Sequence, residues 1–322
     1  MKTESIFKDW AASVDLTKTR VIKFPSYIFL CGGRISPSSD NYFDSCRDIF
    51  YSHIRNNNYS FSKNVVLAED VIKYFESSVY QDLLSFEKDL ASLSALTVIF
   101  SESPGAIAEL GSFSVLEYIQ KRILVVLHED HSYDQNSFIW KGPISFLRNI
   151  AKANGCDDPI LIYNWKNVSH QNAVCRLELE DFSDVSDLSD AIELIMKKRD
   201  KTNVLKKDHA GHIMLLISSI LNVIQIATTE EIIYLLNAFD LKKHASYAEK
   251  YLSLLKSLDI IDFAPYRNYK YFATKRPQID WLKWAYHNGD DTFRWTTKFL
   301  SFYEKNQEEK IKALRSHFKI ER

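Results

Sequence analysis

TVIFSESPGAIAELGSF, residues 97–113, is the stretch of the sequence that decides the fold. Its first four residues form a short apolar run that is typical of a buried strand. Pro104 and Gly105 then turn the chain, and residues 107–120 predict a helix. A strand that leads through a tight loop into a helix is the repeating unit of a parallel sheet, so this stretch indicates an α/β fold.

The same unit recurs on both sides of this stretch. Strands are predicted at residues 27–31, 65–67, 97–100, 123–127 and 159–163, and helices at residues 43–56, 80–94, 107–120 and 188–198. This alternation predicts a Rossmann-like parallel sheet flanked by helices. Ligands bind beyond the carboxyl ends of such strands. The loops that follow Cys31, Leu67, Phe100 and Leu127 are therefore the places to search for a site.

Glu109 is the most informative residue of the loop after Phe100. The predicted helix start at residue 107 places it in the first turn, where the helix dipole favours a charged carboxylate. Such a group can serve as a nucleophile or stabilise positive charge. A glutamate that only complements the helix dipole is the alternative. Gly111, inside the same helix, predicts a close approach of the sheet or a ligand.

Gly32 and Gly33 directly follow the first strand. Two glycines let the backbone approach a ligand, and the next helix offers N–H groups to a phosphate. A plain tight turn accounts for them as well. The sequence has no GxGxxG pattern, so the usual dinucleotide fingerprint is absent.

Three segments carry a family resemblance: FLCGG at residues 29–33, LLSFEKDLASLSALTVIF at 83–100 and SESPGAIAELGSFS at 101–114. Together they resemble nucleoside 2-deoxyribosyltransferase-like domains, above all those of retron effector proteins, over residues 26–150. The resemblance places the catalytic glutamate on Glu109. The second carboxylate falls on Glu87 in the retron-effector register and on Asp89 in the register of free-standing transferases. Glu69 matches the family's acidic loop.

The resemblance implies cleavage of an N-glycosidic bond in a nucleotide, with NAD favoured as the substrate and no cofactor or metal. Such cleavage passes through an oxocarbenium-like state that carboxylates stabilise or trap. Glu109 would act at C1′, and Glu87 would hold ribose hydroxyls or assist the leaving base. The remaining substrate-binding candidates are Gly32, Gly33, Glu69, Asp89, Ser103 and Gly105.

The chain is expected to divide into residues 1–200 and a mostly helical domain at residues 201–322. Helices at residues 212–226, 228–239 and 245–258, followed by a hairpin at 260–274, resemble a winged helix over residues 208–276. The start of its third helix and its wing are the places where phosphate contacts, or protein contacts, are expected. The candidate residues there are Lys242, Lys243, Lys250, Arg267 and Lys270.

Charge and composition bound the remaining possibilities. Residues 201–322 hold 20 Lys and Arg against 14 Asp and Glu, while residues 1–200 carry a net charge of −7. This asymmetry fits either chance or a basic domain that faces a polyanion.

The four cysteines form no CxxC pair, which argues against a zinc site and suits a reducing cytoplasm. No apolar run is long enough to cross a membrane, and the N-terminus lacks a secretion signal. The aromatic tail after residue 278 indicates a core or a subunit interface in a homo-oligomer.

Three hypotheses follow. The first is a toxic effector of a retron anti-phage system, restrained by the retron reverse transcriptase and its multicopy single-stranded DNA–RNA hybrid. The second is a non-catalytic nucleotide-sensing regulator that binds DNA. The third is a glycosyltransferase that modifies a macromolecule.

Overall fold

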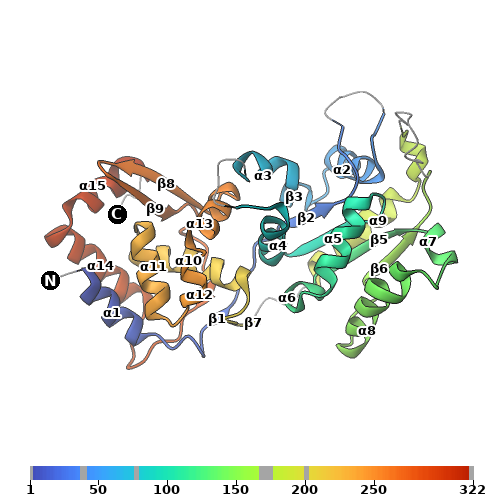
Figure 1. The fold of residues 1–322 in the computed structure, drawn as a ribbon. Coiled ribbons are helices and arrows are strands. Elements are labelled where there is room, and N and C mark those ends of the chain that lie inside the picture. Colours follow the sequence, from blue (N-terminus) through green and yellow to red (C-terminus); the bar gives the residue numbers. More distant parts are fainter. Residues whose placement is uncertain (1–2, 37–41, 76–79, 167–176, 199–202, 319–322) are drawn as a thin grey trace. The chain divides into compact units, whose positions relative to one another are not determined.

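The computed structural model describes residues 3–36, 42–75, 80–166, 177–198 and 203–318, and the chain forms two compact units (Figure 1). We call residues Pro25–Val71 and Ser94–Arg199 the α/β unit. We call residues Met1–Phe24, Ile72–Leu93 and Asp200–Arg322 the helical unit. The expected division at residue 200 therefore describes the chain incompletely, because two earlier segments belong with the C-terminal part.

The α/β unit contains the five predicted strands in one parallel sheet, with the order β3-β2-β4-β5-β6. The register pairs Leu30 with Leu67 on one side and with Val98 on the other. The strands are short and apolar, and β4 and β5 are buried along their whole length, as expected for a sheet covered on both faces. Their bounds are β2 (Ile28–Cys31), β3 (Val65–Leu67), β4 (Leu96–Phe100), β5 (Ile123–His128) and β6 (Ile160–Tyr163).

Helices α2 (Cys46–Asn56) and α9 (Val185–Lys197) pack against each other over one face of the sheet, where Ile28, Val98 and Val126 join them in a hydrophobic core. Helix α5 (Pro104–Ser114) packs elsewhere on the sheet through Phe113, whose ring lies 6.3 Å from that of Phe29. Because side chains alternate along a strand, Phe29 points away from the α2 face.

The remaining elements of this unit are short and connect the strands. They are η1 (Ser62–Asn64), the first four residues of α3 (Ala68–Phe75), α6 (Glu117–Gln120), α7 (Asp130–Tyr133), the π-helix η2 (Trp140–Ile144), α8 (Ser145–Ala153) and η3 (Leu179–Phe182). The expected single helix at residues 107–120 is in fact two helices, because α5 starts at Pro104 and a break follows Ser114. Cys31, Cys46 and Cys156 form no disulfide, and Cys175 lies outside the described residues.

The helical unit is organised around α10 (Ala210–Ile224), which is buried along nearly its whole length. It packs against α4 (Leu83–Leu93), α13 (Ala248–Ser257) and α14 (Thr292–Asn306). A helix that is apolar on all sides is expected at the centre of a bundle. Gly211 explains how α4 joins it: a Cβ at this position would lie 2.1 Å from the Ser92 carbonyl oxygen.

The predicted helices and hairpin of the C-terminal part are present: α11 (Thr229–Ala238), α13, and the antiparallel strands β8 (Ile261–Tyr266) and β9 (Tyr269–Thr274). The third predicted helix, at residues 245–258, corresponds to α13, and the short helix α12 (Lys242–Ala245) precedes it as a separate element. Ala227, between α10 and α11, forms a bridge with Phe272 of β9. The sequence did not predict α1 (Thr3–Ser13) or the small sheet of β10 (Leu282–Lys283), β1 (Arg20–Val21) and β7 (Asn203–Val204).

The aromatic tail forms core rather than an exposed stacking surface. Trp10 of α1 contacts the rings of Trp284 and Phe299 at 5.5 and 5.8 Å. Trp281, Trp295, Phe299, Phe302 and Tyr303 are all buried. The last helix, α15 (Glu308–His317), packs on α14 and against β8.

Candidate active site

The strand order of the α/β unit indicates where its sheet can bind a ligand. Strand β2 is flanked by β3 and β4, so the connections on its two sides run in opposite directions along the sheet. In open parallel sheets of this order the ligand crevice lies at this switch point, beyond the carboxyl ends of the two central strands. Those ends are Cys31 and Phe100. The loops that the sequence selected are therefore the two that meet there.

Helix α5 presents Glu109 beside this edge of the sheet. Ser103 is the N-cap, and its Oγ accepts the Ala106 N–H at 3.2 Å, while Pro104 starts the helix. Glu109 thus lies in the second turn rather than the first, where the helix dipole acts more weakly. Its side chain is partly buried.

Gly111 differs from its expected role. A Cβ at this position would meet no atom within 4 Å, so no close approach of the sheet requires a glycine here. Gly111 is exposed, and the described residues give no contact that explains the glycine.

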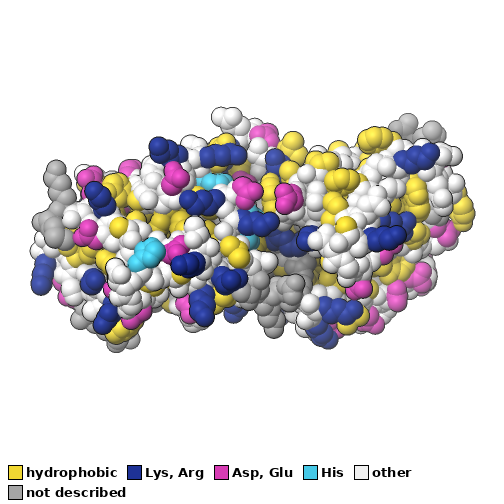
Figure 2. Space-filling model, turned by 90° about the horizontal axis from the view of Figure 1, so that it is seen from below, with side chains coloured by type: hydrophobic (Ala, Val, Ile, Leu, Met, Phe, Trp, Pro, Cys, Tyr) yellow, Lys and Arg dark blue, Asp and Glu magenta, His cyan; other side chains and the backbone are white. Residues whose placement is uncertain are grey.

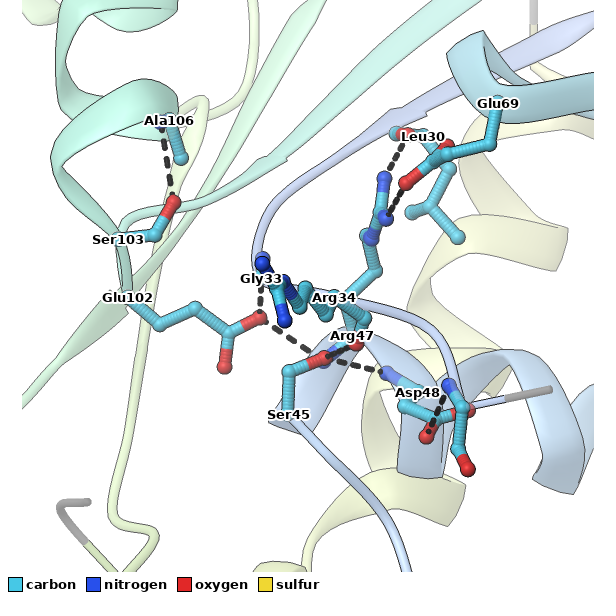
Figure 3. Close-up of polar contacts among 11 residues, drawn as sticks. Leu30, Gly33, Arg34, Ser45, Arg47, Asp48, Glu69, Glu102, Ser103 and Ala106 are labelled. Atoms are coloured by element: carbon cyan, nitrogen blue, oxygen red, sulfur yellow. Dashed lines mark hydrogen bonds and ion pairs between the residues drawn. The ribbon is translucent and has the colours of Figure 1, made fainter. Parts of the chain in front are cut away.

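The centre of the switch point is held by Glu102, a residue that the sequence did not single out (Figure 3). Its carboxylate accepts N–H groups from Gly33 at 2.9 Å, Cys46 at 2.7 Å and Arg47 at 3.1 Å. Burial raises the pKa of the Glu102 carboxyl, and the three N–H donors act in the opposite direction by stabilising the charged form. The carboxylate therefore joins the β4–α5 loop to the β2 turn and to the first turn of α2.

Gly32 and Gly33 are explained by this internal packing. A Cβ at Gly33 would lie 2.5 Å from the Cβ of Ser45, and one at Gly32 would lie 2.9 Å from the Arg47 Cδ. The Gly33 N–H that was expected to face a phosphate instead donates to Glu102. The tight approach that the two glycines permit is thus to the chain's own side chains.

Arg47 is the second residue that sequence reasoning missed. Its guanidinium is buried, and it donates to the Leu30 carbonyl oxygen at 3.0 Å and to Glu69, with which it forms an ion pair. Glu69 begins α3 immediately after β3, and its side chain remains half exposed. The arrangement fixes a carboxylate at the carboxyl end of β3, as the acidic-loop resemblance implied. A sequence gives little sign of such a role, because a charged residue near a helix start is usually solvated.

Ser103 and Gly105 lie in the same loop as Glu102. The Ser103 hydroxyl is engaged as the cap of α5. Gly105 is exposed, and a Cβ there would have only the Ser103 Oγ nearby, at 3.9 Å. The structure therefore brings Gly32, Gly33, Glu69, Ser103, Gly105 and Glu109 into one unit at the carboxyl edge of one sheet.

Glu87 and Asp89 lie on α4 and belong to the helical unit. The Asp89 carboxylate accepts the Tyr80 hydroxyl at 2.9 Å, and burial raises its pKa to about 6. Asp89 is thus engaged in packing α4 within its own unit. Glu87, two residues earlier on the same helix, is partly buried.

This environment predicts how Asp89 affects stability. Because its pKa is raised from 3.8 to about 6 on folding, the native state binds more protons than the unfolded state in this window, and stability falls as pH rises through it. We expect Asp89→Asn to raise the free energy of unfolding at pH 7 by roughly 2 kcal/mol and to have little effect below pH ~4. Urea denaturation at both pH values measures this, with exposed Asp9→Asn as the control. An equal effect of Asp89→Asn at both pH values would contradict it.

A comparison with protein families identifies the chain. Residues 44–263 match the family model described as STM3845 retron effector protein, which covers most of the chain. The chain belongs to this family.

Two curated relatives of this retron effector, both from Escherichia coli, carry informative names. The "Retron Ec73 putative ribosyltransferase/DNA-binding protein" is 25% identical over 189 residues, which cover 56% of the effector and 54% of the relative. The "Retron Ec86 putative ribosyltransferase/DNA-binding protein" is 28% identical over 130 residues, which cover 38% of the effector and 37% of the relative. The effector therefore matches about half or less of each relative's length.

The described part of the retron effector contains neither a membrane-spanning helix nor a cluster of metal-binding side chains. Within residues 3–318, apart from the undescribed gaps, no helix is both long and apolar enough to span a membrane. Among the same residues no group of three or more His, Cys, Asp or Glu side chains is arranged to hold a metal ion.

The basic candidates of the effector's helical unit fall into two groups. Lys242 and Lys243 are exposed, and among the described residues they form no ion pair. Lys270 is exposed as well, but its ammonium lies 4.1 Å from the centroid of the Phe263 ring. Arg267 instead pairs with Glu309 of α15, and the Lys250 ammonium lies 5.4 Å from the centroid of the Tyr80 ring. On the face shown in Figure 2, Lys and Arg side chains are interspersed with Asp and Glu.

The contacts of His244 explain why α12 is separate from the third helix, α13. It is buried in α12, where it contacts the Tyr251 hydroxyl at 2.9 Å and the Lys207 carbonyl oxygen at 2.7 Å. The residues 242–247 therefore form a separate turn fixed to the core, and α13 is the helix that follows it.

Proposed function

We propose that this retron effector cleaves an N-glycosidic bond in a nucleotide, with NAD as the favoured substrate. The observation that carries the proposal is the position of Glu109 on α5, directly after β4 and beside the switch point of the sheet. A carboxylate there can support or attack C1′ as the bond to the base breaks and positive charge develops on the ribose. The names of the two E. coli relatives, which include ribosyltransferase, support this class of chemistry.

Other carboxylates complete the proposed roles. Glu69, held by Arg47 at the end of β3, is placed to accept hydrogen bonds from ribose hydroxyls. The resemblance assigned the second carboxylate to Glu87 or Asp89, and both lie on α4 in the helical unit, so the proposal for the α/β unit rests on Glu109 and Glu69. NAD enters this scheme as a substrate, so the proposed reaction needs no cofactor.

The C-terminal part supports a second role, as a winged helix that docks the reverse transcriptase and its DNA–RNA product. The order of α10, the Ala227 bridge, α11, α13 and the β8–β9 hairpin is that of a winged helix. The bridge supports this assignment, because Ala227 exchanges two backbone hydrogen bonds with Phe272 at 3.0 and 2.7 Å. In our proposal this contact restrains the toxic activity until infection.

The difference in intramolecular contacts among the basic side chains predicts which of them bind the DNA–RNA product. We expect Lys242 and Lys243 to contact phosphates, so their joint replacement by Gln should lower the slope of log affinity against log salt by about 2 units. Lys250→Gln with Arg267→Gln is the matched comparison and should change the slope less, because both side chains have intramolecular contacts, as Lys270 also has. Fluorescence anisotropy with a DNA–RNA hybrid measures both. An unchanged slope in the variant of Lys242 and Lys243 would mean that this surface binds protein.

Transfer of the glycosyl group to a macromolecule is the second candidate reaction, and the word ribosyltransferase in the names of the two relatives supports a transfer reaction. The deciding experiment incubates the purified full chain with NAD in ¹⁸O-labelled water and follows the products by mass spectrometry. Hydrolysis gives nicotinamide and ADP-ribose that carries ¹⁸O at C1′. Nicotinamide without free ADP-ribose indicates transfer, and no consumption of NAD or any other nucleotide would refute the proposal.

A further inference from the structure

Glu102 occupies the place where a sheet of this order offers backbone N–H groups to an anion. Helix α2 is 11 residues long and begins at the β2 side of the switch point, so the N–H groups of its first turn point at the crevice. In dinucleotide-binding sheets these groups hold a phosphate. Here the N–H groups of Gly33, Cys46 and Arg47 all donate to one carboxylate of the chain itself.

The surrounding side chains close around this carboxylate. A Cβ at Gly33 would lie 2.5 Å from the Cβ of Ser45 and 3.1 Å from the Glu102 Oε1. Ser45 caps α2 by accepting the Asp48 N–H at 3.0 Å, and its hydroxyl donates to the Arg34 carbonyl oxygen at 2.6 Å. The turn after β2 is therefore shaped for the approach of Glu102 and Ser45.

Glu102 lies in the short connection between β4 and α5. Its neighbour Ser101 donates its N–H to the Val126 carbonyl oxygen at 2.9 Å, which continues the β4–β5 pairing, and Ser103 caps α5. The carboxylate thus ties this connection to the turn after β2 and to the first turn of α2. Glu109 is seven residues further along the same segment.

We propose that Glu102 is a built-in anion that closes the N-terminus of α2 to the phosphate of the substrate and positions α5. This inference rests on the proposed function and deepens it. At this edge of the sheet the protein then recognises the ribose and base of the nucleotide through Glu69 and Glu109. The phosphate groups of the substrate do not contact the three N–H groups that Glu102 occupies. Glu102 acts as a positioning residue in this scheme.

The test uses inorganic phosphate and needs no turnover, so its failure and a failure of the proposed function are distinguishable. In Glu102→Ala the three N–H groups lose their acceptor, and we expect the melting temperature to fall by about 5–10 °C. Millimolar phosphate should restore part of this loss, because it binds the vacated donors in the folded state only. Glu102→Gln keeps one acceptor oxygen and should show a smaller fall and a smaller response to phosphate.

Two controls test whether the response to phosphate depends on the loss of Glu102. The unmodified chain and the exposed-site variant Glu180→Ala should show no phosphate-dependent change in melting temperature, and the amide NMR signals of Gly33 and Cys46 in the unmodified chain should stay in place on titration with phosphate. Movement of those signals would show that phosphate displaces Glu102 and would overturn the proposal. A Glu102→Gln variant that is destabilised but gains nothing from phosphate, together with an unresponsive Glu102→Ala, would overturn it as well.

Discussion

Replacement of Glu109 by Gln is expected to reduce glycosidic cleavage by the purified effector by ~10²–10⁴-fold while leaving the fold intact. The substitution keeps the size of the side chain and removes the charge that would support C1′. Because Glu109 is only partly buried on one face of α5, its loss should change the melting temperature little. The measurement is the rate of nicotinamide release from NAD.

Glu180→Gln is the matched control for this experiment. Glu180 is an exposed glutamate of the same α/β unit and lies in η3. Its variant should retain full activity. If Glu109→Gln consumed NAD at the unmodified rate, Glu109 would be a glutamate with a structural role only, and the alternative of a non-catalytic sensor would be favoured.

The largest stability effect is expected from Glu231→Ala in the helical unit. Both carboxylate oxygens of Glu231 contact the ammonium of Lys310, at 2.6 and 2.7 Å, and Lys310 has a side chain that is only 3% exposed. Removal of Glu231 leaves this buried cation without its counter-charge, which costs about 3–5 kcal/mol of folding free energy. It also removes the capping-box contact of Glu231 with the Thr228 N–H.

The pH dependence of this variant identifies the cause. Burial lowers the pKa of Lys310, and Glu231 opposes that effect. Below the ordinary lysine pKa the unfolded chain then binds more protons than the folded one, so the stability of Glu231→Ala should rise with pH. Lys310→Met removes the charge and should cost far less than Glu231→Ala. Urea denaturation of both variants between pH 7 and 10 tests this, and equal losses in the two variants would contradict it.

The strands of the α/β unit were predictable because each is a short apolar run in a regular alternation with helices. That pattern predicted all five strands and selected the four loops after Cys31, Leu67, Phe100 and Leu127 as the places to search for a site. The predicted position of Glu109 on the helix after β4 followed from Pro104 and Gly105. The helix start was wrong by one turn, because the sequence did not show that Ser103 acts as the cap.

The features that could not be predicted depend on contacts between residues that are far apart in the sequence. Helix α4 lies between β3 and β4 in the chain, yet it packs in the helical unit because Gly211, more than a hundred residues later, lets the Ser92 backbone approach α10. In the same way, nothing near Glu102 in the sequence indicates that its carboxylate meets Gly33 and Cys46.

The sequence by itself thus determined the class of fold and the order of strands and helices in the α/β unit, because local apolar runs and turn residues encode them. Only the tertiary structure decided which unit each helix joins, which glycines serve packing and which N–H groups are already occupied. The physical reason is that these features depend on contacts between segments whose approach is set by the packing of the whole chain.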